Sequence, residues 1–247
     1  RAPVDLRVNI RKATLPQVQQ ALESEGILAT PFELVENCLR ISENARKLKL
    51  SSAYSDGLVE LQDAGSQALV NAMPLSNQQK VLEYCAGGGG KSLAIAAQAE
   101  ADCYAHDVNT ARMNDIPLRA ARAGVQIKCL ATSKLSQHSP YDLVLCDAPC
   151  SGSGAWRRSP DAKWKFTKER FEDLLKVQGE ILETAQNFVR EGGFLCYATC
   201  SLFAEENEHQ VNKFLNNNSK FELLEQKSWT PLDQCDGFYI ATLQLKG

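Results

Sequence analysis

The chain has 247 residues, a net charge of −3 and a hydrophobic fraction of 44%, values that are ordinary for a soluble globular protein. Its length accommodates one large α/β domain and a small additional one. No window reaches the run of about eighteen uncharged apolar residues that a membrane span needs, so we expect a soluble, cytoplasmic protein without a membrane partner. The slight negative charge does not indicate nucleic-acid binding, which would then depend on a local basic cluster.

The start of the chain and its nine cysteines bear on the compartment. The chain begins RAPVDLRVNI, with neither a methionine nor a signal-type apolar run, which indicates a fragment start with sequence missing upstream. Most of the cysteines lie within apolar, strand-like segments. We therefore expect reduced thiols in a cytoplasm, one or two of them reactive, rather than the disulfides of a secreted protein.

Residues 1–55 predict a small α+β subdomain. VDLRVNI alternates as a strand does, TLPQVQQALESEG has the period of an amphipathic helix that ends at Gly26, and ELVENCLRI suggests another strand. The unit is too short for a substantial core of its own. We expect it to pack on the larger domain.

Residues 56–247 predict that domain, because strands and helices alternate along them. After LVELQ and the helix AGSQALVNAM, the expected elements are the strand KVLEYCA, a helix from Lys91, the strand CYAHDV, a helix over 109–123, the strands IKCLAT and YDLVLCDAP, a helix over 168–190, the strand GGFLCYATCS, a helix over 205–215, and the strands FELLE and GFYIATLQL. Several strand runs are continuously apolar, as expected of strands covered by helices on both faces. This pattern predicts a doubly wound, mainly parallel α/β sheet.

The stretch VLEYCAGGGGKSLAIAA, residues 81–97, has the form of a strand, a glycine turn and a helix start. It does not fit a nucleotide-hydrolysing P-loop, because Cys85 stands where that motif needs its first glycine. The dinucleotide spacing G-x-G-x-x-G also fails, since Gly87 to Gly90 are consecutive. What remains is a turn that lets backbone amides approach a ligand at a helix N-terminus.

Asp107 ends the next strand, AHDV, twenty residues after Gly87. In a doubly wound sheet an acid at this place reaches the hydroxyl pair of a ribose. The alternative is that Asp107 caps the helix that follows. The glycine loop favours the ribose interpretation, and a nucleoside cofactor without phosphates at the loop points to S-adenosylmethionine.

Two further strands end in cysteine-containing motifs. YDLVLCDAPCSGSG carries Asp147 and Cys150, and GGFLCYATCS carries Cys200. Ligands of open α/β sheets bind outside the carboxyl ends of the strands. If these strands are neighbours, both thiols and the carboxylate meet beside the glycine loop.

A zinc site is the alternative for these cysteines, which form the pairs Cys146/Cys150 and Cys196/Cys200. Structural zinc pairs usually have shorter spacing on turns, and all four thiolates must converge. Cys146 and Cys196 lie within apolar strands and suit burial better, so we expect no metal. The other cysteines are interpreted as packing residues: Cys38, Cys85, Cys103, Cys129 and Cys235.

The chain resembles the Sun family of RNA cytosine-5 methyltransferases. The matching segments occur in family order over nearly the whole chain: PVDLRVN, ELQDAGSQ, VLEYCAGGGGKS, AHDVNTARM, DLVLCDAPCSGSGAWRRSPDAKW, YATCSLFAEENE and DGFYIATLQLK. The resemblance implies a seven-stranded, Rossmann-like class I methyltransferase sheet and an RNA-binding type of N-terminal subdomain. It further implies S-adenosylmethionine-dependent methylation of a cytosine in ribosomal RNA, or alternatively transfer RNA.

The resemblance also implies a covalent mechanism. Carbon 5 of cytosine is a poor nucleophile until a thiolate adds to carbon 6. By resemblance Cys200 is that thiolate and Cys150 assists breakdown of the adduct, although in DNA cytosine methyltransferases the cysteine after proline is the nucleophile. Asp147 would hold the cytosine near ring nitrogen 3, and Lys91 would favour thiol ionisation or position Asp147.

The cofactor-binding set that the resemblance implies consists of Cys85, Ala86, Gly87, Gly88, Gly89, Gly90, Lys91, Asp107 and Asp147. The chain departs from the family at two places. Gly88 stands where the family usually has proline. The family's acid after strand three is missing, and ATSKL offers Thr132 or Ser133 instead, of which Ser133 is added to the cofactor set. We expect weaker adenine contacts as a consequence.

The segment GAWRRSPDAKWKFTKER follows Cys150 closely and mixes basic with aromatic residues. Such a mixture provides phosphate-binding charge and stacking surfaces for RNA. The alternative is a solvated loop whose aromatic residues pack inward. Because the segment follows Cys150, RNA contact is favoured, with a single-stranded or flipped cytosine as the target. The predicted RNA-binding residues are Arg157, Arg158, Lys163, Trp164 and Lys165.

Two functions from different classes follow. The first is a monomeric RNA cytosine-5 methyltransferase. The second is an RNA-binding or assembly module with a vestigial cofactor site, which the altered loop and the missing acid would explain. The presence of both cysteines favours the enzyme.

Overall fold

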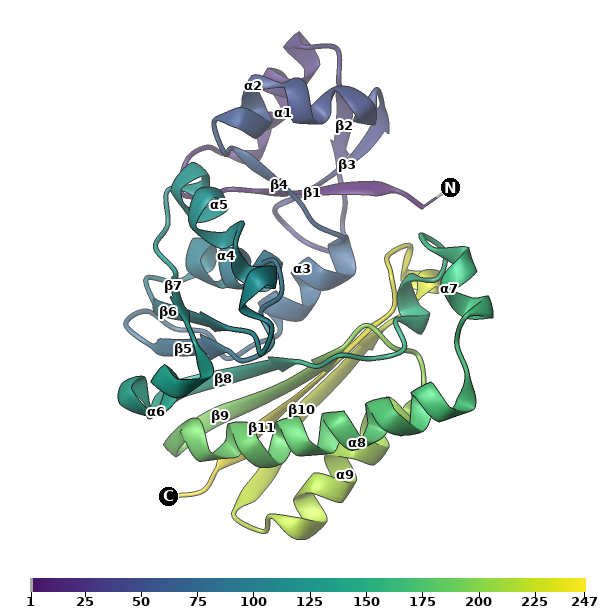
Figure 1. Cartoon of the computed structure of the whole chain (residues 1–247). Helices are drawn as coiled ribbons and strands as arrows, with labels where there is room; N and C mark the ends of the chain where they lie inside the picture. Colours follow the sequence, from purple (N-terminus) through teal and green to yellow (C-terminus); the bar gives the residue numbers. More distant parts are fainter. Residues whose placement is uncertain (1) are drawn as a thin grey trace.

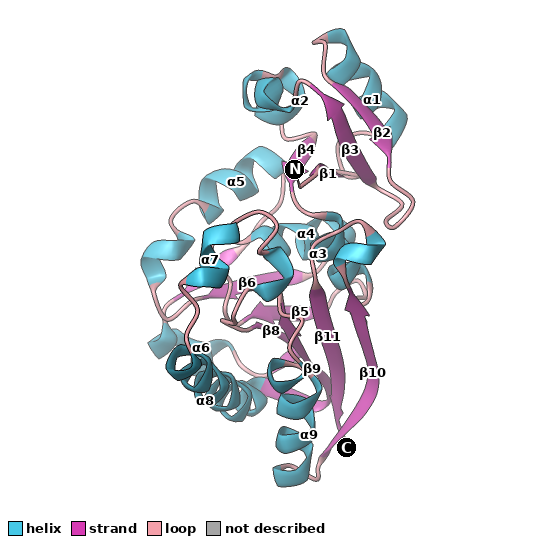
Figure 2. Cartoon of the chain, turned by 90° about the vertical axis from the view of Figure 1, so that its right-hand side faces the viewer, coloured by secondary structure: helices cyan, strands magenta, loops and turns pink. Residues whose placement is uncertain are grey.

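The computed structural model describes residues 2–247 and contains two β-sheets (Figure 1, Figure 2). The strands are β1 (Val4–Val8), β2 (Leu28–Pro31), β3 (Cys38–Glu43), β4 (Val59–Leu61), β5 (Lys80–Glu83), β6 (Asp102–His106), β7 (Lys128–Leu130), β8 (Tyr141–Asp147), β9 (Val189–Thr199), β10 (Phe221–Trp229) and β11 (Phe238–Leu245). The α-helices are α1 (Leu15–Ser24), α2 (Ser52–Ser55), α3 (Ala64–Asn71), α4 (Gly90–Gln98), α5 (Ile116–Ala123), α6 (Leu135–His138), α7 (Pro160–Trp164), α8 (Lys168–Ala185) and α9 (Glu208–Asn217).

The smaller sheet belongs to the N-terminal part of the chain. Its strand order is β2-β3-β1-β4, and the paired strands are antiparallel. Helix α1 buries Val18 and Leu22 in the cluster that covers this sheet. The sequence does not predict β2, which is a short edge strand with mostly exposed residues. The fourth strand, β4, follows residue 55, and the domain boundary there stays a prediction.

The larger sheet has the strand order β10-β11-β9-β8-β5-β6-β7. The strands from β9 to β7 pair in parallel, and β11 pairs antiparallel with both of its neighbours. A parallel sheet needs crossover connections, and helices supply them between successive strands. The predicted doubly wound, seven-stranded sheet is therefore confirmed.

Helices cover both faces of this sheet (Figure 1, Figure 2). Leu143 and Leu145 of β8 pack in a cluster with residues of α3 and α4. Val144 and Cys146, which alternate with them, pack in another cluster with residues of α8 and α9. The continuous apolar run of β8 is thus explained by burial on both faces.

Several predicted elements have other bounds in the structure, among them the following three. The helix expected over 109–123 is interrupted: a 3₁₀ turn, η2 (Thr110–Met113), precedes α5, whose first turn holds Pro117. Proline has no backbone N–H and is tolerated only in a first turn. The helix expected over 168–190 ends at Ala185, because Val189 pairs with Tyr141 in the sheet. The strand FELLE continues to Trp229 through its pairing with β11.

The topology brings four strand ends together. β5 lies between β6 and β8, so the connections leave it in opposite directions, and such a switch point forms a crevice at the carboxyl ends of the strands. Over residues 2–247, none of the helices is both long and apolar enough to cross a membrane.

Candidate active site

A cavity of about 690 Å³ lies at the carboxyl ends of β5, β6, β8 and β9. Its size is within the usual range for sites that enclose small molecules, about 300–1,000 Å³. Most of the residues predicted for the cofactor and for catalysis line it, namely Cys85, Ala86, Gly87, Gly88, Gly90, Lys91, Asp107, Asp147, Cys150 and Cys200. Gly89 and Ser133 are not among its lining residues.

The glycine loop turns from β5 into α4. Gly87 and Gly89 have φ values of +52° and +75°, a region that residues with a Cβ rarely adopt. A Cβ on Gly89 would also lie 2.7 Å from Ile116, so Gly89 faces α5 rather than the cavity. Gly88 has no such requirement, because an added Cβ would lie 3.5 Å from its nearest neighbour, Arg119. The backbone therefore explains two of these glycines and leaves Gly88 replaceable.

Asp107 connects the glycine loop to the end of β6. Its carboxylate accepts hydrogen bonds from the amides of Gly87 (2.9 Å) and Asn109 (2.9 Å) and pairs with Arg112 (3.0 Å). The N-cap of η2 is Asn109, so the interpretation of Asp107 as a helix cap is wrong. The side chain is almost fully buried and still borders the cavity.

The residues after β7 differ from the prediction in one respect. Thr132 lines the cavity, whereas Ser133 is exposed and does not. The Thr132 hydroxyl lies 2.9 Å from Nε2 of His106, whose Nδ1 lies 2.7 Å from the carbonyl oxygen of Tyr84. Because a carbonyl only accepts, Nδ1 carries the proton and the Thr132 hydroxyl donates to Nε2. Burial lowers the pKa of His106, which keeps this ring neutral.

Lys91 and Asp147 form an ion pair in the lining of the cavity. The Nζ of Lys91 lies 2.6 Å from Oδ2 of Asp147. Burial alone would lower the pKa of Lys91, but the attraction and hydrogen bond of Asp147 outweigh it and raise that pKa. Lys91 therefore holds a positive charge within the cavity at neutral pH.

Glu83 is a buried acid that the sequence interpretation missed. It accepts hydrogen bonds from the amide and the hydroxyl of Ser92 and so fixes the first turn of α4. Burial, and then the charge of Asp147, raise the pKa of Glu83 to about 8. The signal in the sequence is a single acid within the apolar run of β5.

The two predicted catalytic thiols are in contact. Sγ of Cys150 lies 3.4 Å from Sγ of Cys200, and both line the cavity. The pairing of β8 with β9 causes this contact, since Asp147 is opposite Ala198 and each cysteine follows its strand end closely. The expectation that neighbouring strands would bring the two cysteines together is correct.

The surroundings of the two thiols differ in charge. The hydrogen bond from Cys150 lowers the pKa of Cys200 and outweighs burial and the charge of Asp147, which raise it; the positive charge of Lys91 acts in the same direction as the hydrogen bond. The hydrogen bond to Cys200 and burial raise the pKa of Cys150, and the carboxylate of Glu206 adds to that increase. These directions favour ionisation at Cys200, with Cys150 as the donor in the contact between the two sulfurs.

The remaining cysteines are free thiols, as is every cysteine of residues 2–247. Cys146 and Cys196 are fully buried in the sheet, as expected of small hydrophobic residues. Cys85 borders the cavity, where burial raises its pKa to about 12, so its thiol stays protonated. Cys129 is exposed on β7 and does not fit the packing role predicted for it.

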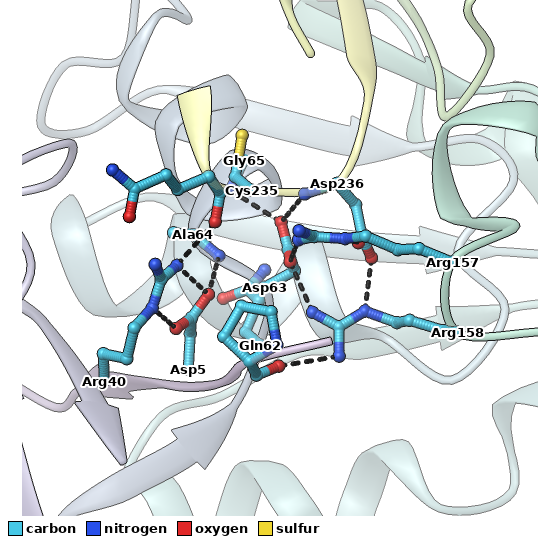
Figure 3. Close-up of polar contacts among 12 residues, drawn as sticks. Asp5, Arg40, Gln62, Asp63, Ala64, Gly65, Arg157, Arg158, Cys235 and Asp236 are labelled. Carbon is cyan, nitrogen blue, oxygen red and sulfur yellow. Dashed lines mark hydrogen bonds and ion pairs between the residues drawn. The ribbon is translucent and has the colours of Figure 1, made fainter. Parts of the chain in front are cut away.

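Arg157 and Arg158, predicted to bind RNA, form ion pairs within the protein (Figure 3). Both guanidinium groups pair with Asp63, at the N-terminus of α3, and with Asp236, just before β11. The Arg158–Asp63 distance is 2.6 Å. These pairs occupy both guanidinium groups, and contact of the two side chains with RNA stays a prediction. Their partners lie more than 70 positions away, so no local pattern indicates the pairs.

The later part of the same segment is different. Trp164 is 83% exposed on α7, and Nζ of Lys163 lies 5.7 Å from the centre of its ring. Lys165 is exposed, and its ion-pair partner among residues 2–247 is Asp161, at 2.8 Å. The other aromatic residues of the segment, Trp156 and Phe166, pack against each other and against Phe203. Lys163, Trp164 and Lys165 thus remain on the surface.

Comparisons with known proteins agree with this geometry. Residues 70–244 match the family model described as 16S rRNA methyltransferase RsmB/F. The chain is 32% identical to ribosomal RNA small subunit methyltransferase B of Salmonella arizonae and 31% identical to that of Vibrio cholerae, each over 98% of this chain. It spans 60% and 59% of the lengths of those two relatives.

Solved structures share the fold. A methyltransferase homolog protein from Pyrococcus horikoshii has a TM-score of 0.85 at 23% identity, covering 99% of this chain and 87% of that one. NSun6 from the same organism, solved with SFG, has a TM-score of 0.87 at 18% identity, covering 100% and 92%. The family match covers most of the chain and includes every cavity-lining residue from Glu83 to Cys200. The chain belongs to the RsmB/F family of 16S rRNA methyltransferases.

Proposed function

We propose that this chain forms the catalytic part of an S-adenosylmethionine-dependent enzyme that methylates carbon 5 of a cytosine in ribosomal RNA. The observation that carries the proposal is the contact between Cys150 and Cys200 in one cavity with the Lys91–Asp147 ion pair. Family membership supports RNA as the partner, and the names of the relatives favour ribosomal over transfer RNA. The free thiols support a cytoplasmic location, and a monomer is the simplest assembly to test by light scattering.

The cavity fits the cofactor. A methyltransferase cofactor of this kind consists of a ribose, an adenine and a methionine. The buried carboxylate of Asp107 suits the ribose hydroxyls, and Thr132 keeps oxygen lone pairs for the adenine amino group. The backbone of the glycine loop and the N-terminus of α4 suit the methionine carboxylate. SFG, an S-adenosylmethionine analogue, in the NSun6 structure supports the same choice.

Bound S-adenosylmethionine would supply an electrophilic methyl group, and the residues of the chain would prepare the base. The Cys200 thiolate forms a bond from its sulfur to carbon 6, while the electron pair of the double bond shifts towards carbon 5. The Asp147 carboxylate accepts a hydrogen bond from the exocyclic amino group beside ring nitrogen 3, and Lys91 balances the negative charge of that carboxylate. Carbon 5 then has the electron density that it lacks in free cytosine.

Cys150 would complete the reaction after methylation. Once the Cys200 sulfur is a neutral thioether, its negative charge no longer raises the pKa of Cys150, so Cys150 can lose its proton to solvent. The Cys150 thiolate then takes the remaining proton from carbon 5. The electron pair of that bond restores the ring double bond, and the bond between Cys200 and carbon 6 breaks to return a thiolate.

Trapping of the covalent adduct tests these roles. Cys150→Ala should accumulate a denaturation-resistant RNA adduct with a cytosine-containing ribosomal RNA fragment, and Cys200→Ala should form none. The opposite pattern would exchange the two roles. If the wild-type chain binds S-adenosylmethionine in calorimetry but methylates no RNA, the proposed activity is wrong. RNA binding without cofactor binding would favour a vestigial cofactor site.

The pH dependence of thiol reactivity provides a second test. Because the pKa of Cys200 is lowered, its thiolate persists to lower pH than that of an ordinary cysteine and disappears as the pH falls through that pKa. Lys91→Met should move the midpoint of Cys200 alkylation by iodoacetamide to higher pH. An unchanged midpoint would show that Lys91 serves only to position Asp147.

A further inference from the structure

Two buried side chains hold the peptide groups on either side of Cys150. Nε2 of Gln178, on α8, donates to the carbonyl oxygen of Pro149 at 3.0 Å. Oε1 of Glu206 accepts from the amide of Ser151 at 2.8 Å. Gln178 and Glu206 are both fully buried, and Nε2 of Gln178 also donates to Oε1 of Glu206 at 2.9 Å. One connected pair thus fixes the residue before Cys150 and the residue after it.

Glu206 also joins this loop to the segment that carries Cys200. It lies in the 3₁₀ turn η6 (Ala204–Glu206), shortly after Cys200. Its carboxylate accepts a hydrogen bond from the hydroxyl of Ser151, and that hydroxyl lies 3.2 Å from the hydroxyl of Ser201. Because α8 holds one side of the Cys150 loop and η6, which follows Cys200, holds the other, the position of the Cys150 thiol is tied to the segment that carries Cys200.

A carboxylate in this place needs an explanation beyond packing. Burying a carboxylate is costly unless its oxygens are well hydrogen-bonded, and here three donors on two side chains and one amide satisfy it. A charged acceptor gives short, directional hydrogen bonds and so defines the position of the Cys150 loop more tightly than apolar packing does. Its negative charge also disfavours ionisation of Cys150, which suits a thiol that must first donate a proton.

We propose that Glu206 and Gln178 are positioning residues that hold Cys150 against Cys200, so that one thiol donates its proton to the other. The catalytic meaning of this arrangement rests on the proposed methyl transfer. The arrangement itself is a property of the protein without cofactor or RNA, and it can be measured there.

Two measurements on the unliganded protein test the positioning. Diamide oxidises two adjacent thiols to a disulfide and is itself reduced to a hydrazine, so the rate of Cys150–Cys200 disulfide formation, followed by peptide mass spectrometry, reports their proximity. The pH profile of Cys200 alkylation by iodoacetamide reports the hydrogen bond from Cys150. The variants are Glu206→Ala, Glu206→Gln and, as matched control, Glu205→Ala, whose side chain is exposed.

Glu206→Ala should slow disulfide formation by about tenfold or more, because displacing reacting groups by even 1 Å has effects of this size. It should also raise the midpoint of Cys200 alkylation. Glu206→Gln should keep the disulfide rate, because its amide oxygen still accepts from Ser151 and its NH₂ group can donate to the Ser151 hydroxyl. Glu205→Ala should match the wild type in both measurements.

The positioning proposal is overturned if folded Glu206→Ala, checked by circular dichroism, matches Glu205→Ala in disulfide rate and alkylation profile. If that variant does not fold, Gln178→Met tests the same contact from the Pro149 side, with the same expected result and the same contrary one. With RNA, Glu206→Ala should accumulate adduct as Cys150→Ala does. A wild-type chain that methylates no RNA would reject the proposed function and leave the two thiol measurements to decide the positioning.

Discussion

Two parts of the basic segment after Cys150 have different surroundings in the structure. Arg157 and Arg158 lie against Asp63 and Asp236, whose side chains are only 9% and 4% exposed (Figure 3). Trp164, a few residues later on α7, is 83% exposed. The sequence makes them look alike, since both parts follow Cys150 and both are basic. The difference is whether the fold brings buried carboxylates to them.

The comparison also explains why the two residues that pair with buried carboxylates are arginines. A guanidinium group presents several N–H donors in a fixed plane and can bind two carboxylates at once, whereas a lysine ammonium is a compact and strongly hydrated charge. Arg157 and Arg158 each bond to both Asp63 and Asp236, and so they tie the Cys150 loop to α3 and to the start of β11. Lys163 has no ion-pair partner within residues 2–247 and stays available to a phosphate.

The largest expected effect is on stability. Arg158→Met should lower the free energy of unfolding by about 2–3 kcal/mol, because it leaves buried carboxylate oxygens of Asp63 and Asp236 without one of their charged donors. Urea unfolding followed by circular dichroism measures this. The matched control is Lys165→Met, which removes a cation from an exposed pair and should change the free energy of unfolding by about 0.5 kcal/mol or less. Equal changes in the free energy of unfolding of Arg158→Met and Lys165→Met would contradict the distinction between the buried arginine pairs and the exposed lysine pair.

The next effect is on RNA binding. Trp164→Ala should weaken binding of a single-stranded, cytosine-containing RNA oligonucleotide by about 1–3 kcal/mol, the usual contribution of stacking one base on an aromatic ring. Its free energy of unfolding should stay unchanged, since the ring is exposed. Fluorescence anisotropy of labelled RNA measures the affinity. Leu232→Ala, at an equally exposed apolar position, is the control. An unchanged RNA affinity in Trp164→Ala would remove α7 from the proposed RNA surface.

These contrasts indicate what sequence can predict about such a fold. The strand pattern and the rule that ligands bind at strand ends suffice to place Cys150, Cys200 and Asp147 together, because each lies at or just after the end of one of two paired parallel strands. The pairs of Arg157 and Arg158 depend on residues distant in the chain. The hydrogen bonds of Glu206 also depend on distant residues, because their donors lie on α8 and in the loop that contains Cys150.

The predictions of two local details are wrong for a different reason. Thr132 rather than Ser133 lines the cavity because a 3₁₀ turn, Thr132–Lys134, begins there and turns Ser133 outward. The helix expected over 109–123 breaks before Pro117, although its apolar period continues. In both cases the outcome depends on where a short 3₁₀ turn begins or ends. Periodicity over a window of ten or more residues does not resolve that difference.

A smaller effect concerns salt. Lys163→Ala should reduce the slope of log affinity against log salt concentration by about 0.7, the value for one phosphate contact on a single strand. Arg157→Lys should leave the slope unchanged, because the side chain at position 157 is engaged by Asp63 and Asp236. Anisotropy titrations over a range of salt concentrations measure both. If Arg157→Lys reduces the slope and Lys163→Ala does not, then Arg157 rather than Lys163 contacts an RNA phosphate.

The smallest effect comes from releasing a cation. Asp161 pairs with Lys165 at 2.8 Å on the surface of α7, and both side chains are mostly exposed. Asp161→Asn removes one negative charge near a bound RNA backbone and frees the ammonium group. Because exposed ion pairs are worth only about 0.2–1 kcal/mol, RNA affinity should rise by a similar amount and stability should change little. Asp63→Asn makes the same change beside Arg157 and Arg158 and should instead lower the free energy of unfolding. RNA affinity should not rise, because Asp236 still holds both arginines. Tighter RNA binding by Asp63→Asn would mean that Arg157 and Arg158 can also contact RNA once they are released from Asp63. Both parts of the segment would then bind RNA and would differ only in how strongly acidic side chains compete for their cations.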